Sequence, residues 1–173
     1  MKVEFLGTGG LWETFAFYER REIIRVIELE DGQAVTLDGT RIRPFRVAED
    51  YVYAFEFEGD GKRVLIAPDE LNGWRPPGEV RGVDLAVLPV GVFELDPFTG
   101  NRRIAKEHPV LGFEATFEET LGMVDALDAG RTILTPVEEM DGLTHDDLQR
   151  LGEDLRREGR NVEFAYDTLV VDA

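Results

Sequence analysis

Three glycine-containing turns separate short alternating segments in the first part of the chain. Asp31-Gly32 and Asp38-Gly39 each stand between two such segments, and Gly59-Asp60-Gly61 follows another. An Asp-Gly pair favours a two-residue hairpin loop because both central positions need a positive φ. The flanking segments alternate polar and apolar residues, which is the period of a half-buried strand. These segments are 22–30, 34–37, 41–47, 51–57 and 62–67. We therefore expect a meander of about five strands.

The remainder of the chain alternates strands with helices. Residues 83–90 are apolar apart from Asp84, which predicts a strand buried on both faces. Thr116, followed three residues later by Glu119, forms a capping box that predicts a helix. Thr144 begins a second predicted helix, which Gly159 would end. Further strands are expected at 131–135, 162–166 and 168–171. The sequence thus predicts one α+β domain over 1–173, an N-terminal β-meander followed by strand-helix-strand-helix-strand.

Net charge limits the partners that the protein can have. Asp and Glu number 36 against 19 Lys and Arg, a formal charge of -17 that repels nucleic acid and anionic membranes. Only three of the cations are lysines, which fits a halophilic protein, although an ordinary acidic surface explains it equally well. No apolar run is long enough to cross a bilayer, and the N-terminus does not have the pattern of a signal peptide. We therefore expect a cytoplasmic protein that binds neither nucleic acid nor membrane.

Several segments resemble those of metallo-β-lactamase-fold proteins. The opening run Phe5-Leu6-Gly7-Thr8-Gly9-Gly10 is similar to their first strand and loop, and 41–70 is similar to their central strands. The last of these strands ends at Asp69, where the family has an aspartate that bridges two metals. Residues 114–167 resemble the closing helix–strand–helix–strand unit. The resemblance is greatest to the branch of phosphoribosyl cyclic-phosphate phosphodiesterases. It implies a reduced metallo-β-lactamase-like αβ sandwich.

The same alignment of segments predicts that the metal ligands have been lost. The family's His-x-His-x-Asp-His loop has no counterpart in this sequence. Glu49 stands where the family has a further histidine ligand, and Pro136 follows Leu134-Thr135 where it has another. Glu114 stands at the position of the branch's acid–base histidine. Of the matched ligands, Asp69 keeps its family identity.

The residue types available restrict the chemistry further. A catalytic zinc needs about three protein ligands and one open position. The chain has no cysteine and two histidines, His108 and His145, and we expect neither to bind a metal. His145 lies in the first turn of a predicted helix, and His108 has no second histidine at ligand spacing. The chain also contains no serine, which excludes a serine nucleophile.

Carboxylates could replace the missing histidines. If the family fold is kept, a group of acidic side chains would converge on the former site, with Glu114 as the catalytic residue and the others as metal ligands. Such oxygen ligands suit Mg²⁺ or Mn²⁺ better than Zn²⁺. They could equally be solvated surface acids around a site that has lost its function. The expected ligands are Asp69, Glu49, Glu138 and Glu139.

Three hypotheses about function follow. The leading one is a degenerate, non-catalytic binding or assembly protein without a cofactor. The alternative is a metal-dependent phosphoester hydrolase that holds a divalent metal (Mn, Mg or Zn) with carboxylates. The third, a truncated normal enzyme, is disfavoured because Glu49 and Pro136 replace histidines that truncation would have kept. The sequence does not identify a small-molecule ligand.

A shortened fold should also leave apolar surface in need of a cover. The strand at 83–90 is expected to be buried on both faces, yet the first half of the fold is reduced. An aromatic group near the N-terminus could cover part of the exposed face, but less than a lost half-domain would. We therefore expect a two-fold homodimer that uses this face. The aromatic residues are Trp12, Phe15, Phe17 and Tyr18.

Overall fold

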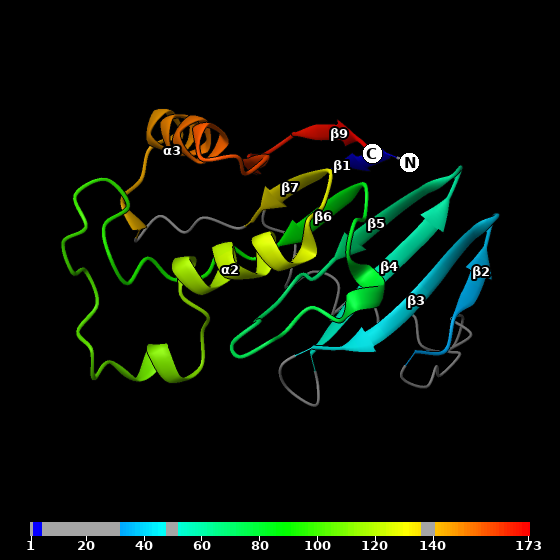
Figure 1. The fold of residues 1–173 in the computed structure, drawn as a ribbon, viewed down its shortest axis with the longest axis horizontal. Helices are drawn as coiled ribbons and strands as arrows, with labels where there is room; N and C mark the ends of the chain where they lie inside the picture. Colours follow the sequence, from blue (N-terminus) through cyan, green and yellow to red (C-terminus); the bar gives the residue numbers. More distant parts are fainter. Residues whose placement is uncertain (1, 5–31, 48–51, 136–140) are drawn as a thin grey trace, which may run out of the picture.

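A mixed sheet organises the structure, a computed structural model that describes residues 2–4, 32–47, 52–135 and 141–173. The described strands of this sheet lie in the order β2-β3-β4-β5-β6-β7-β8 (Figure 1). Their bounds are β2 Val35–Leu37, β3 Thr40–Arg46, β4 Tyr53–Gly59, β5 Lys62–Ile66, β6 Leu85–Leu88, β7 Arg131–Leu134 and β8 Val162–Phe164. A separate pair joins β1 (Lys2–Glu4) to β9 (Val170–Asp172), so the two ends of the chain lie side by side. The predicted α+β class is confirmed.

Antiparallel hairpins build the first half of the sheet, from β2 to β5. Asp38 and Gly39 join β2 to β3 with φ of 47° and 82°, and Asp60 and Gly61 join β4 to β5 with φ of 55° and 71°. Both turns therefore have the positive φ values that the sequence predicts. The expected strand at 22–30 lies outside the described residues.

Parallel pairing builds the second half, from β5 to β8. Helix α2 (Phe117–Leu127) lies between β6 and β7 in the chain, and α3 (His145–Arg157) lies between β7 and β8. Two 3₁₀ helices, η1 (Gly78–Val80) and η2 (Pro109–Gly112), lie within the connections before and after β6. Because the strands are parallel, the carboxyl ends of β5 to β8 meet at one edge of the sheet.

Both predicted capping boxes are present. The Thr116 hydroxyl accepts a hydrogen bond from the Glu119 amide at 3.2 Å, and the Glu119 carboxylate accepts one from the Thr116 amide at 2.8 Å. Thr144 and Asp147 make the same pair of bonds at the start of α3. Gly159, with φ of 95°, follows the end of α3 as predicted. Neither helix, nor any other in the described part of the chain, has the length and apolar character to span a membrane.

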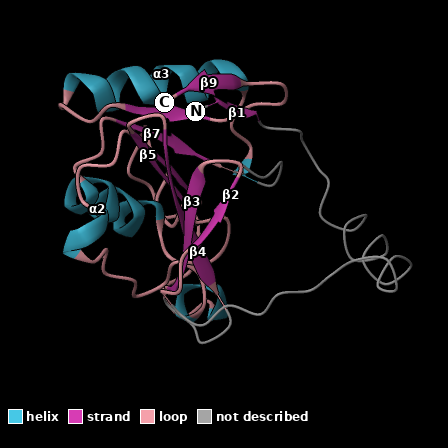
Figure 2. Cartoon of the chain, turned by 90° about the vertical axis from the view of Figure 1, so that its right-hand side faces the viewer, coloured by secondary structure: helices cyan, strands magenta, loops and turns pink. Residues whose placement is uncertain are grey.

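The sheet is apolar on both faces. On one face, alternate residues of the central strands pack against α2 and α3, and Figure 2 shows α2 beside that face. On the other face, Val64, Leu85, Val87 and Ile133 are at most 3% exposed and cluster with Leu169 and Val171 around β9. The expected strand buried on both faces is therefore confirmed, as the shorter segment β6. The aromatic residues expected to cover this face lie outside the described residues, and the homodimer stays a prediction.

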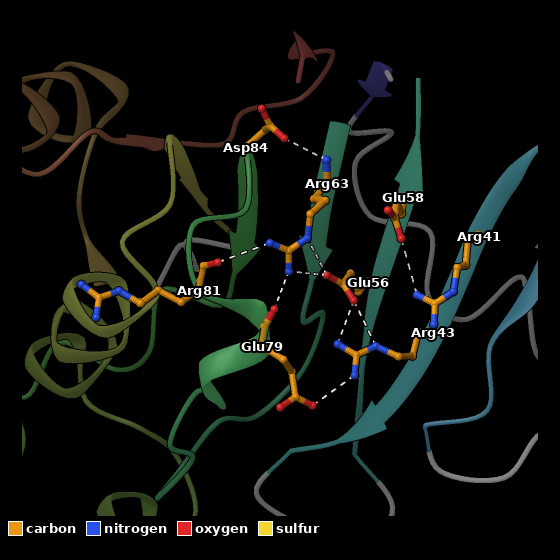
Figure 3. A network of polar contacts seen from close by, with 8 residues as sticks. All are labelled: Arg41, Arg43, Glu56, Glu58, Arg63, Glu79, Arg81 and Asp84. Carbon is orange, nitrogen blue, oxygen red and sulfur yellow. Dashed lines mark hydrogen bonds and ion pairs between the residues drawn. The ribbon is translucent and has the colours of Figure 1, made fainter. Parts of the chain in front are cut away.

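A buried carboxylate and two arginines link β3, β4 and β5 to η1. Glu56 on β4 is only 5% exposed and lies between Arg43 on β3 and Arg63 on β5 (Figure 3). Its two oxygens accept hydrogen bonds of 2.8 Å from Arg43 Nη2 and 2.7 Å from Arg63 Nη2. Arg43 also binds the Glu79 carboxylate, and Arg63 donates to the Glu79 carbonyl. Burial alone would raise the pKa of Glu56, but the hydrogen bonds from the two arginines offset it and the net pKa is lowered.

We predict that Glu56→Gln lowers the free energy of unfolding by about 2–3 kcal/mol at neutral pH, because two partly buried arginines lose their counter-ion. The lowered pKa means that the stabilisation by Glu56 is fully present above the ordinary pKa of glutamate. It is lost as the pH falls through the lower folded-state value, so the difference between variant and wild type should shrink in acid. Urea unfolding across a pH series measures it.

Glu58→Gln, two residues along the same strand, is the matched control. Glu58 forms an exposed 3.6 Å ion pair with Arg41, so its loss should change stability by no more than about 0.5 kcal/mol. Equal effects of the two substitutions would contradict a special role for the buried network.

Candidate functional site

The carboxyl edge of the parallel strands is the place where open sheets with helical crossovers bind ligands. After β5 the chain continues through Pro68 to Asp69 and Glu70. After β6 it runs to Val92, whose amide donates to the Ala115 carbonyl at 2.8 Å. This bond fastens the segment just before α2 to the end of β6. Residues from two distant parts of the sequence therefore meet at this edge.

Gly91 permits the close approach of these two segments. Its φ is +75°, and a Cβ there would lie 2.6 Å from the Ala115 carbonyl oxygen and 2.9 Å from the Thr120 hydroxyl. Both distances are far below van der Waals contact. A glycine is therefore required to place Glu114 and Ala115 against the end of β6.

Glu70 and Glu114 form a carboxyl pair at this edge. Glu70 is half-buried, and its Oε1 accepts a hydrogen bond from the Ala115 amide at 3.0 Å and another from the Asn72 amide. The carboxyl group of Glu114 lies close to it. Burial, followed by the proximity and the negative charge of the Glu114 carboxyl group, raises the pKa of Glu70 to about 7, while the two backbone amides act in the opposite direction. Near neutral pH the pair therefore holds a proton in a large fraction of molecules.

Asp69 lies next to this pair in the chain. Its side chain is exposed, and Oδ1 accepts a hydrogen bond from the Glu70 amide at 2.8 Å. The structure thus places two of the predicted site residues, Asp69 and Glu114, next to Glu70. The other predicted ligands, Glu49, Glu138 and Glu139, lie outside the described residues, so their convergence on the edge stays a prediction.

Both histidines have local contacts. His108 precedes η2, and its Nδ1 accepts a hydrogen bond from the Val110 amide at 3.2 Å. His145 is exposed in the first turn of α3, as expected, and its ring lies edge-on to Tyr166 with 5.5 Å between centroids. Within the described ranges, no three or more His, Asp or Glu residues are grouped as a metal site would need.

Glu70 was not among the residues predicted from the sequence. Its environment depends on contacts with Glu114 and Ala115, more than forty positions away in the chain. The available signal was a pair of consecutive acidic residues directly after a buried strand, where a single acidic residue was expected from the family resemblance. This pair of acidic residues places Glu70 at the carboxyl edge of the sheet, but it does not indicate that Glu114 lies beside it.

Comparison with known proteins identifies the fold. No protein-family model and no curated protein sequence matches the chain. Among solved structures, it is similar to the metallo-β-lactamase-fold protein YhfI from Bacillus subtilis, with 14% identity and a TM-score of 0.59 over 91% of this chain and 61% of that one. Zn²⁺-bound PqqB from Methylobacterium extorquens has 16% identity and a TM-score of 0.54 over 84% of this chain and 51% of that one. A diphosphatase from the PhnP family has 18% identity and a TM-score of 0.50 over 93% of this chain and 55% of that one.

These similarities confirm the predicted fold, a reduced metallo-β-lactamase-like fold. The chain spans between 51% and 61% of the length of the three structures. At such low identity the likeness concerns the fold and not the activity.

We predict that Glu70→Gln stabilises the protein at alkaline pH and leaves it nearly unchanged near pH 4, below the ordinary pKa of glutamate. The pKa of about 7 in the folded state is above the ordinary value of 4.5, so the folded protein binds a proton that the unfolded chain releases. The free energy of unfolding of the wild type should therefore fall as the pH rises from 4.5 to about 7. The amide of the variant stays neutral over this range and still has the oxygen that accepts hydrogen bonds from the Ala115 and Asn72 amides. At about pH 8 the variant should be more stable by roughly 1–2 kcal/mol, a value reduced for partial exposure.

Urea unfolding of both proteins across the pH range measures this effect. Glu107→Gln, an exposed glutamate in the loop before η2, is the control for removing one negative charge and should give a difference independent of pH. If the difference in free energy of unfolding between Glu70→Gln and wild type is also independent of pH, Glu70 does not hold a proton near neutral pH.

Proposed function

We propose that this protein is a degenerate member of the phosphodiesterase-like branch of the metallo-β-lactamase fold. In this proposal it has lost most of its binuclear metal centre and has a non-catalytic binding or assembly role. The observation that carries the proposal is the local use of both histidines. The Nδ1 atom of His108 accepts a backbone hydrogen bond, and His145 packs edge-on against Tyr166 in the first turn of α3.

The donor atoms of the chain do not fit a binuclear zinc centre. Zinc sites in proteins are built mainly from histidine nitrogen and cysteine sulfur, with carboxylates as additional ligands. The complete sequence has two histidines and no cysteine. With His108 engaged by the Val110 amide, the edge offers mainly oxygen atoms. We therefore derive no catalytic step through zinc.

One observation favours a second candidate, a metal-dependent phosphoester hydrolase with a carboxylate site. The pKa of Glu70 is raised by burial and by the nearby carboxyl group of Glu114. A divalent cation such as Mg²⁺ or Mn²⁺ would relieve this repulsion as a proton does. Asp69, beside the pair, would be a further oxygen ligand. The two candidates therefore differ in a measurable quantity, bound metal.

We predict that the purified protein, equilibrated with zinc and then dialysed, retains far less than one zinc per chain, because it has no cysteine and its two histidines make local contacts. Elemental analysis by mass spectrometry measures this content. Near-stoichiometric zinc that is lost in Asp69→Ala and kept in Glu107→Ala would overturn the degenerate assignment.

The same samples separate the two candidates. The protein should not hydrolyse an aryl phosphodiester such as bis(nitrophenyl) phosphate above background in Mg²⁺ or Mn²⁺. Hydrolysis that requires one of these ions and is abolished by Asp69→Ala and Glu114→Gln, with Glu107→Gln active, would establish the second candidate in place of the first.

The proposed assembly is a homodimer. Several large apolar side chains of the described residues are exposed, Phe113 at 71% among them, and their burial against a second copy would be favourable. We predict a dimeric mass by light scattering coupled to size exclusion at molar salt, because salt screens the repulsion between two chains that each carry -17. A monomeric mass at high micromolar concentration would contradict the proposed assembly.

A further inference from the structure

A cleft of about 580 Å³ lies between the two helices and the connection that follows β6. One wall is the loop from Glu94 to Gly100, another is the first turns of α2, and the third is the second half of α3. In Figure 1 the connection from β6 to α2 forms the left side of the molecule, next to the beginning of α2. The volume is within the range of small-molecule sites. The cleft shares no residue with the carboxyl pair or with Asp69.

The floor of the cleft is apolar. Leu151 and Leu155 of α3 are buried, and Phe117 and Leu121 of α2 are partly buried against the same core. Leu95 of the loop is 38% exposed and lines the cleft from the opposite side. An aliphatic or aromatic group would remove this surface from water on binding, which is favourable at about 25 cal/mol per Å².

The rim of the cleft is strongly acidic. Its carboxylates come from all three walls, and among the described residues that line it Arg157 is the one cation. Arg157 is already paired with Glu153 and with Asp154. The rim carboxylates are Glu94, Asp96, Glu118, Asp154 and Glu158.

Three of these carboxylates have cationic partners, whereas Glu118 does not. Glu94 binds Arg102, Asp154 binds Arg157, and Glu158 binds Arg160 at 2.7 Å. Glu118 is exposed in the first turn of α2 and forms no ion pair with any residue in the described part of the chain. It is therefore available to a cation from outside.

Helix polarity also favours a cation over an anion. The last turn of α3 lines the cleft, and the carbonyl groups at a helix C-terminus carry partial negative charge. The N-terminus of α2 would attract an anion, but Glu118 and Glu119 occupy its first turn and the Glu119 amide already donates to Thr116. An anionic ligand would therefore meet five carboxylates with little compensation.

We propose that this cleft binds a small organic cation that combines an aliphatic chain with protonated amino groups. The chain packs on the leucine and phenylalanine floor, and the ammonium groups lie at the acidic rim, one of them at Glu118. This site requires neither a metal nor the carboxyl pair. Asp69→Ala should therefore bind the cation as wild type does, which separates the result from that of the metal experiments.

A terminal diaminooctane is the probe, and the octanediol of the same chain length is its neutral counterpart. Calorimetric titration at moderate salt should detect the diamine and give an affinity at least about tenfold higher than that for the diol. Amide shifts in ¹⁵N NMR spectra should be largest around Leu95, Glu118 and Leu121. No binding at millimolar diamine, equal binding of diol and diamine, or shifts spread evenly over the acidic surface would each overturn the proposal.

Matched variants test the location. Glu118→Gln should weaken diamine binding about threefold, whereas Glu107→Gln, which removes the same charge from an exposed loop, should leave it unchanged. Leu95→Ala should also weaken binding about twofold to threefold through lost apolar contact. Equal weakening by the two glutamate substitutions would show attraction to the general negative charge and would overturn a specific site.

Discussion

Burial of the central strands on both faces is the constraint on which the other features depend. β6 has no exposed residue, and its alternate side chains belong to two separate apolar clusters. The cluster on one face holds α2 and α3, and the cluster on the other holds the segment around β9. Because β5, β6, β7 and β8 are parallel, every connection between them must cross back along the sheet, and their carboxyl ends share one edge. The carboxyl pair and the predicted aspartate lie there for this reason.

Local signals in the sequence were sufficient for most of the fold. Asp38-Gly39 and Thr116 with Glu119 each determine a backbone geometry within four residues, so turn and cap could be predicted directly. The pairing of β1 with β9 could not, because it joins residues about 170 positions apart and each strand has three residues. The αL conformation of Asp128 after α2 was also missed, since glycine and not aspartate is the usual residue there.

The site was predictable only in part. The family resemblance selected Asp69 and Glu114 separately, and the structure places both around Glu70. The sequence does not give the distance between two segments. Here that distance depends on the close approach of Gly91 to Ala115. A glycine with positive φ at the end of a buried strand indicates a close contact, but not which residue makes it.

Glu56 in the sheet and Glu70 at its carboxyl edge show how strongly neighbours determine the protonation of a carboxyl group. Glu56 is the more buried, yet its pKa is lowered because Arg43 and Arg63 hold both of its oxygens. The pKa of Glu70 is raised because burial and the neighbouring carboxyl group of Glu114 act in the same direction, and the two backbone amides that bind it offset them only in part. The first arrangement stabilises the sheet, whereas the second lowers the free energy of unfolding above neutral pH, although Glu70 binds the amides of Ala115 and Asn72. A destabilising pair at the ligand-binding edge of a sheet is therefore the feature that most needs a functional explanation, either as the remnant of a metal centre or as the carboxylate site of a working one.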